Sequence, residues 1–144
     1  MRNARARGGF TLIEVMVVIV VITLLAALVA PNVFRNLGTA KDGAARSQME
    51  MLTAALDAYR LDNGRYPTTQ QGLEALWTEP VAEPLPQAWR GPYLRKAVPR
   101  DPWGNAYIYR NPGEENPNGF DLLTYGADAA PGGEGEDADI RSWE

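Results

Sequence analysis

The side chains of this sequence that could do chemistry are mainly carboxylates. The chain has 144 residues with no histidine and no cysteine, so the Ser-His-Asp and Cys-His arrangements of nucleophilic catalysis cannot be built. Zinc sites of the usual His/Cys kind are excluded for the same reason. What remains is oxygen chemistry, meaning ion pairs, hard-cation binding, or acid–base work by paired carboxylates. Two places concentrate it: Glu14, and an acidic stretch between Tyr125 and Trp143.

The C-terminal stretch mixes acids with glycines, which are Asp128, Glu134, Glu136, Asp137 and Asp139 among Gly126, Gly132, Gly133 and Gly135. Ca²⁺ binds several carboxylate and backbone oxygens, and glycines let a loop turn its carbonyls toward an ion. The D-x-D-x-D-G spacing of an EF-hand is missing. Composition alone favours a solvated or disordered acidic tail.

Glu14 lies at the start of an apolar run, VMVVIVVITLLAALVA, which extends to Ala30. Together with residues 10–14 the run is about 21 residues long, enough to span a hydrocarbon core as a helix. A charge within such a span costs roughly 2.5–3.5 kcal/mol on insertion scales, so Glu14 requires a partner. The sequence therefore predicts a transmembrane helix with one unusual carboxylate.

Two simpler interpretations of the run account for it incompletely. A removable signal peptide has a shorter apolar region and a small residue before its cleavage site; here Leu28-Val29-Ala30 is followed by Pro31. A plain single-pass anchor explains the length, and the leader arginines Arg2, Arg5 and Arg7 favour a cytoplasmic N-terminus. It does not explain Glu14.

Charge also limits the partners. The net charge is −4, and the first nine residues hold three of the 14 basic residues and no acid, so the remainder is still more acidic. Phosphate binding needs clustered Lys and Arg, so nucleic acid is not an expected partner.

The rest of the chain predicts a helix followed by a small sheet. Apolar residues at helical spacing predict an amphipathic helix with a buried stripe, comprising Leu37, Ala40, Ala44, Met51, Leu52, Ala55, Leu56 and Tyr59. Asp62-Asn63-Gly64 ends it. Thr68 and Gln71 form a capping-box pattern before a short helix. Residues 106–110 and 120–125 predict an antiparallel strand pair, with a third strand near Val98.

These predictions give four regions. Residues 1–9 are a leader, residues 10–33 a transmembrane helix, and residues 34–63 the amphipathic half of the same helix. Residues 64–144 are a globular head. Its acidic loop covers about residues 125–139.

The N-terminal residues GGFTLIEVMVVIVVI resemble the class III signal of type IV pilins and pseudopilins. The resemblance implies that a prepilin peptidase cuts between Gly9 and Phe10 on the cytoplasmic face, and that Phe10 is then N-methylated. Cleavage would leave an ammonium at Phe10, one helical turn from Glu14, so an ion pair in low dielectric becomes available. The resemblance implies that neighbouring subunits make this pair and so set the register of a filament.

Three further stretches resemble the major pseudopilins of type II secretion systems, namely YRLDNGRYPTTQQGLEAL, RGPYLRKAVPRDPWGNAYIYRNPG and YGADAAPGGEGEDADIRSW. The resemblance implies a pilin-like α+β fold, with one long N-terminal helix, half transmembrane, packed on a small antiparallel β-sheet head. It implies a non-enzymatic subunit of a homopolymer, the periplasmic pseudopilus, that drives export of folded proteins across the outer membrane. Implied partners are minor pseudopilins and an inner-membrane assembly platform with its ATPase. The subunit would be a single-pass inner-membrane protein with its head in the periplasm.

The same resemblance implies that Ca²⁺ binds in the C-terminal loop. Asp128 and Asp137 are the expected side-chain ligands, and Tyr125 would offer its main-chain carbonyl. Glu136 and Asp139 are alternatives for the remaining carboxylate. Mg²⁺ is disfavoured because a flexible loop rarely provides tight octahedral geometry.

Two other functions are considered. A surface or DNA-uptake type IV pilin would share the N-terminus, although many such pilins close a C-terminal loop with a disulfide and this chain has no cysteine. A membrane-anchored enzyme working with carboxylates would need paired acids in a pocket, whereas the acids here gather in one loop.

Overall fold

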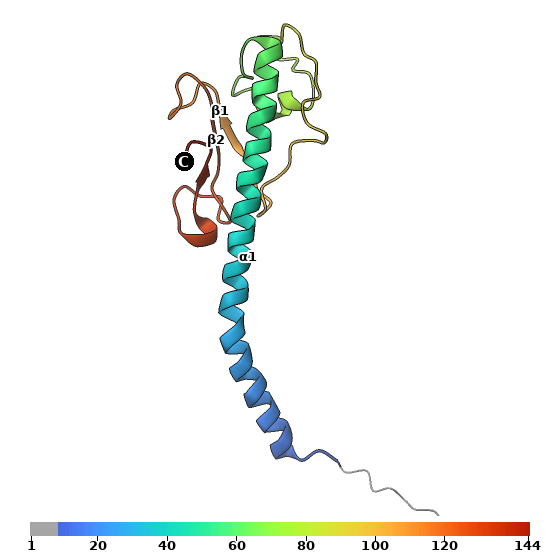
Figure 1. The fold of residues 1–144 in the computed structure, drawn as a ribbon, viewed down its shortest axis with the longest axis vertical. Helices are drawn as coiled ribbons and strands as arrows, with labels where there is room; N and C mark the ends of the chain where they lie inside the picture. Colours follow the sequence, from blue (N-terminus) through green and yellow to red (C-terminus); the bar gives the residue numbers. More distant parts are fainter. Residues whose placement is uncertain (1–8) are drawn as a thin grey trace, which may run out of the picture. The chain divides into compact units, whose positions relative to one another are not determined.

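The computed structural model describes residues 9–144, and for residues 29–36 it describes the backbone only. The predicted leader, residues 1–9, therefore lies almost entirely outside the described part. The chain divides between Leu37 and Gly38 into two compact units. One helix, α1 (Leu12–Asn63), runs through both, and all other elements belong to the second unit (Figure 1).

The first turn of α1 is capped by a side chain. Thr11 Oγ1 accepts a hydrogen bond from Glu14 N (3.3 Å), and Glu14 Oε2 accepts one from Thr11 N (2.8 Å). This reciprocal pattern is a capping box, which satisfies amides that have no partner inside the helix. At the other end Gly64 takes a left-handed φ of 73° and donates to the Arg60 carbonyl, so the predicted helix end at Asp62–Gly64 is confirmed.

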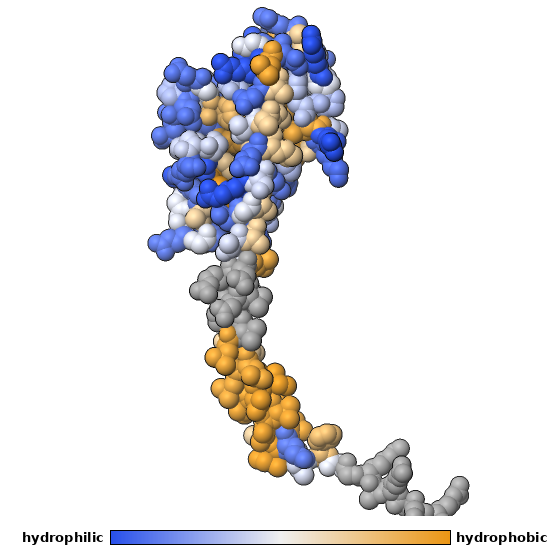
Figure 2. Space-filling view, in the orientation of Figure 1, coloured by the Kyte–Doolittle hydropathy of each residue, from blue (hydrophilic) through white to orange (hydrophobic). Residues whose placement is uncertain are grey.

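The described part of the first unit exposes mainly apolar side chains. From Leu12 to Leu28 the large apolar side chains of α1 are exposed, and they form the continuous orange segment of Figure 2. Among the described residues, no helix meets the combined length and hydropathy of a membrane-crossing helix. The expected span, residues 10–33, includes residues 29–33, whose side chains are not described.

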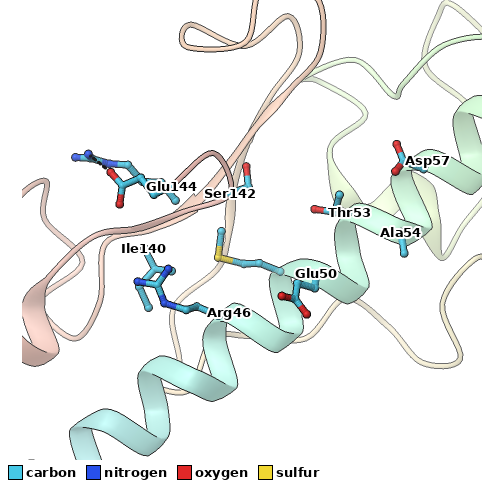
Figure 3. Close-up of a pocket in the computed structure, with 10 residues that line it drawn as sticks. Arg46, Glu50, Thr53, Ala54, Asp57, Ile140, Ser142 and Glu144 are labelled. Atoms are coloured by element: carbon cyan, nitrogen blue, oxygen red, sulfur yellow. Dashed lines mark hydrogen bonds and ion pairs between the residues drawn. The ribbon is translucent and has the colours of Figure 1, made fainter.

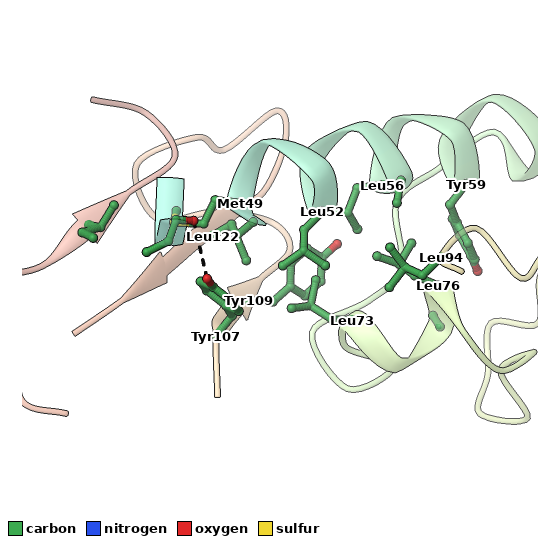
Figure 4. Packing of buried hydrophobic residues seen from close by; sticks show 14 residues of the cluster. Met49, Leu52, Leu56, Tyr59, Leu73, Leu76, Leu94, Tyr107, Tyr109 and Leu122 are labelled. Carbon is green, nitrogen blue, oxygen red and sulfur yellow. Dashed lines mark hydrogen bonds between the residues drawn. The ribbon is translucent and has the colours of Figure 1, made fainter. Parts of the chain in front are cut away.

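The second unit packs α1 on the head through one stripe of buried residues, Ala45, Met49, Leu52, Ala55, Leu56 and Tyr59. These side chains meet a shell contributed by the head, comprising Leu73, Leu76, Leu94, Tyr107, Tyr109, Leu122 and Ile140 (Figure 4). The predicted stripe was partly wrong. Leu37 and Met51 are half exposed, and Ala40 and Ala44 are exposed. The helix has apolar residues on more than one face, and the head covers only one of them.

A three-stranded antiparallel sheet forms the centre of the head. Strand β1 (Ile108–Arg110) pairs with β2 (Asp121–Thr124), and β2 pairs with β3 (Ile140–Arg141), in the order β1-β2-β3. The predicted antiparallel pair is confirmed. The prediction of a third strand near Val98 was wrong, because the third strand comes from the C-terminal end of the chain.

The Thr68–Gln71 capping box is also confirmed. Gln71 Oε1 accepts from Thr68 N (3.0 Å), and Thr68 Oγ1 accepts from Gln71 N (3.2 Å). It is followed by a 3₁₀ helix, η1 (Leu73–Leu76), rather than a longer α-helix. Gly72, with a φ of 61°, turns the chain out of the helical path between them.

Candidate functional site

The N-terminal motif is accessible on the surface of the first unit. Phe10 is 87% exposed, and Gly9 has open space around it. Glu14 is exposed as well, and its Oε2 accepts both the amide and the hydroxyl of Thr11, at 2.8 Å each. Glu14 thus has an internal partner before any cleavage. This role of Thr11 was not predicted, although the T-x-x-E spacing of residues 11–14 indicates a capping box.

The predicted calcium loop is a folded segment of the second unit and not a tail. Its neck closes where Ala127 N donates to the Glu136 carbonyl (2.8 Å), and Asn105 Nδ2 donates to the Gly126 carbonyl (2.8 Å). A short 3₁₀ helix, η2 (Gly135–Asp137), leads back to β3. Gly126 requires the absence of a side chain, because a Cβ there would lie 2.5 Å from the Glu136 carbonyl oxygen.

Two of the predicted ligand side chains are available to solvent. Asp128 and Asp137 are exposed. Asp128 Oδ1 accepts only the Ala130 amide (3.0 Å), and in the described part of the chain the Asp137 carboxylate has no hydrogen-bond or ion-pair partner. Tyr125, whose main-chain carbonyl oxygen is the third expected ligand, is half-buried directly after β2. These three residues stay candidate ligands.

The two alternative acids are engaged elsewhere. Asp139 Oδ2 pairs with Arg141 (3.0 Å) and its Oδ1 accepts the Gly132 amide (3.0 Å). Glu136 Oε2 pairs with Lys41 (3.3 Å) and accepts Trp103 Nε1 (3.2 Å). The Trp103 hydrogen bond, with a further contribution from Lys41, lowers the pKa of Glu136. Each already has a donor that competes with a cation.

The oxygen atoms of the loop are of the kind that Ca²⁺ binds, but in this structure they are not gathered around one point. Carboxylates and glycine-flanked carbonyls are the hard oxygens that Ca²⁺ prefers. Among the residues that the structure describes, no three acidic side chains gather as a metal-binding group. An ion at this site would therefore draw the exposed acids together.

Sequence reasoning missed the buried carboxylate that fixes the neck. Asp101 is 4% exposed. Its Oδ1 accepts the amides of Trp103 (3.1 Å) and Asn105 (2.7 Å), and its Oδ2 accepts the hydroxyl of Thr124. Residues 101–105 form a tight turn, and Trp103 packs against the core of the head. The turn also carries Asn105, which holds the neck at Gly126.

A second buried carboxylate, Asp121, fixes a different loop. Its oxygens accept the amides of Glu114 (2.7 Å), Glu115 (2.9 Å) and Asn116 (3.0 Å), and the Asn116 side-chain amide (3.0 Å). Burial alone raises the pKa of Asp121, but these hydrogen bonds outweigh it and the pKa is lowered.

A groove of about 360 Å³ lies between α1 and the C-terminal residues (Figure 3). Side chains of both charge signs line it, with Arg46 and Glu50 on α1 and Arg141 and Glu144 at the C-terminal end. Arg141 and Glu144 pair with each other at 2.8 Å. The groove is an open, mixed-charge surface.

Comparisons with known proteins agree on one family. Residues 32–143 match the family described as "Type II secretion system (T2SS), protein G", and residues 4–30 match the "Prokaryotic N-terminal methylation motif". The chain is 49% identical over 140 residues to the type II secretion system core protein G of Pseudomonas aeruginosa, covering 97% of each. It is 47% identical over 144 residues to that of Vibrio cholerae, covering 99% of this chain and 96% of the other.

A solved structure gives the same result. The fold matches the crystal structure of the major pseudopilin from the type 2 secretion system of enterohaemorrhagic Escherichia coli, with a TM-score of 0.66 and 40% identity. The match covers 78% of this chain and 95% of that one. The predicted pilin-like α+β architecture is therefore confirmed.

Proposed function

This chain belongs to the protein G family of type II secretion systems, and from that membership we propose that it is the subunit of a periplasmic pseudopilus. In this proposal many copies polymerise into a filament that drives folded proteins through an outer-membrane channel. The matched relatives favour this function over a surface or DNA-uptake pilin, since they are named as secretion core proteins.

The observation that carries the proposal is the N-terminal motif on an exposed apolar helix. Phe10 is open to a processing enzyme, and Glu14 stands within one turn of it. After cleavage the new ammonium at Phe10 would compete with Thr11 for the Glu14 carboxylate. An ammonium in low dielectric is the stronger partner. In the filament the Phe10 amine of one subunit would pair with Glu14 of its neighbour.

Membrane anchoring is part of the same proposal. A helix that is apolar on all sides is stable only when apolar surroundings cover it, and α1 exposes such residues from Leu12 to Leu28. We place residues 10–33 in the inner membrane and the head in the periplasm. A prepilin peptidase, minor pseudopilins and an assembly platform would be its partners.

Ca²⁺ binding in the C-terminal loop is a further component of the proposal. Asp128 and Asp137 would hold the ion with the Tyr125 carbonyl, and Asp139 would complete the site only by giving up Arg141. The bound cation would neutralise acids that otherwise repel one another across a glycine-rich loop. Such an ion would order the loop in each subunit of the filament.

Mass spectrometry of the protein from cells with and without a prepilin peptidase tests the processing step. The expected mature mass is that of residues 10–144 plus one methyl group. An intact leader in peptidase-positive cells would contradict the assignment. A matched Gly9→Ala variant should stay uncut, and a Gly43→Ala variant, altered within α1, should be processed normally.

A secretion assay tests the filament. Glu14→Ala should abolish export and leave the head folded, because the hydrogen bonds described for Glu14 are made to Thr11, within its own unit. Glu50→Ala, a charge removal on the same helix, serves as the control. Normal export by Glu14→Ala would remove the proposed role of Glu14.

A further inference from the structure

The side chain of Glu136, in the C-terminal loop, contacts residues that lie far from it in the sequence. Its carboxylate contacts Lys41 on α1 (3.3 Å) and the indole N–H of Trp103 (3.2 Å). Its aliphatic part lies against Gly38, where a Cβ would come within 3.0 Å of Glu136 Cγ. One loop side chain thus meets both the helix and the 101–105 turn.

The backbone of Glu136 closes the neck of the same loop. Its carbonyl accepts the Ala127 amide (2.8 Å) and lies where a side chain at Gly126 would otherwise sit. Side chain and backbone therefore act at different places. The first holds the loop to its surroundings, and the second joins the two ends of the loop.

The partner Trp103 is itself held in place. Its amide donates to buried Asp101, and the same carboxylate fixes the amide of Asn105. Asn105 in turn holds the Gly126 carbonyl. The contacts of Glu136 are therefore made to a turn that is anchored in the core of the head and to a helix, neither of which depends on an ion.

We infer that Glu136 is a positioning residue that seats the loop on α1 and Trp103, and that it is not a ligand of the bound cation. Seating the loop in advance reduces the conformational entropy lost when Asp128 and Asp137 bind an ion. The effect on ion affinity rests on the proposed calcium site, whereas the seat itself does not.

The first test counts ligands in the full-length protein in detergent, with Eu³⁺ as the probe. Luminescence lifetimes in H₂O and D₂O give the number of waters on the ion. Glu136→Ala should weaken binding roughly tenfold, as loss of an outer-shell contact does, with no added water. Asp137→Ala, which removes a ligand, should add about one water. The exposed loop acid Glu134 provides the matched control, and Glu134→Ala should change neither quantity. An added water in Glu136→Ala would overturn the inference.

The second test needs no ion. Thermal melts in EDTA of Glu136→Ala, Trp103→Phe and the double variant form a cycle for the seat. If Glu136 and Trp103 hold the loop together, the double variant should lose less melting temperature than the two single losses added. Strict additivity would overturn the seat. Failure of the wild type to bind Eu³⁺ would instead refute the calcium proposal, and this cycle would still decide the role of Glu136.

Discussion

Two loops of the head place their carboxylates in different environments. The loop before β2 folds around the buried Asp121, whose two oxygens receive four N–H groups. The loop before β3 has two acids, Asp128 and Asp137, that are exposed to solvent. A carboxylate surrounded by donors needs no cation, whereas acids that lack donors repel one another until a cation or solvent screens them.

The comparison separates a loop that is complete within the chain from one that depends on its environment. The Asp121 loop should have the same stability in chelator and in calcium. The C-terminal loop is secured at its neck, at Glu136 and by the Gly132–Asp139 hydrogen bond, and in the proposed calcium site an ion would order the exposed acids of the loop.

The largest effect is expected from Asp121→Ala. The variant leaves three backbone amides and one side-chain amide without their acceptor, and each hydrogen bond to a charged group contributes about 1.5–3 kcal/mol. Total destabilisation should reach about 3 kcal/mol or more, measured by urea unfolding. The loss should be equal in calcium and in EDTA. A loss found only in EDTA would mean that the two loops are coupled.

A smaller effect is expected from chelation of the wild type. A ligand present at a hundred times its dissociation constant stabilises the folded state by about 2.7 kcal/mol, so melting in EDTA should occur at a lower temperature than in millimolar calcium. Asp128→Asn and Asp137→Asn should melt at the same temperature in both buffers. Glu134→Gln, a neutral change in the same loop, should keep the wild-type difference. Equal melting of the wild type in both buffers would contradict calcium binding.

Sequence patterns predicted the elements better than they predicted the roles of individual acids. The long helix, its C-terminal end and the strand pair follow from periodicity and turn residues, which act over short distances. Asp121 was assigned only to a strand, because periodicity says nothing about which backbone amides a side chain will meet. Two-residue β3 is too short to show a period at all.

The distinction between Glu136 and Asp139 could not be made from sequence for a related reason. Both are acids of the same glycine-rich loop, and the partners that engage Glu136 are Lys41 and Trp103, 95 and 33 residues away. The nearer partner of Asp139 is Arg141, which a search for i,i+2 pairs would have found. The capping box of Thr11 and Glu14 could also have been predicted, since the same spacing was recognised at Thr68.

The contribution of Asp121 to stability should be visible in the pH dependence of the free energy of unfolding. The pKa of Asp121 is lowered in the folded state, so it stabilises the fold above its unfolded value of about 3.9 and loses that contribution as pH falls below it. The free energy of unfolding should therefore decrease between pH 5 and pH 3. In Asp121→Asn this part of the decrease should be missing. An unchanged slope in that variant would assign the acid sensitivity to other carboxylates.

The smallest expected effect tests the seat of the C-terminal loop from the helix side. Gly38→Ala gains helix propensity, up to about 1 kcal/mol in a helix interior, but its methyl group would meet Glu136 Cγ at 3.0 Å. The side chain must move, which weakens its contacts with Lys41 and Trp103, so the net change in the wild type should be near zero. In a Glu136→Ala background the obstruction is gone, and Gly38→Ala should stabilise the protein measurably in urea unfolding. A methyl group added at Gly43 would meet open space, so Gly43→Ala should stabilise the protein equally in both backgrounds. Equal gains for Gly38→Ala in the two backgrounds would show that Glu136 does not rest on α1 in solution, and the seat would then consist of its hydrogen bond with Trp103 alone.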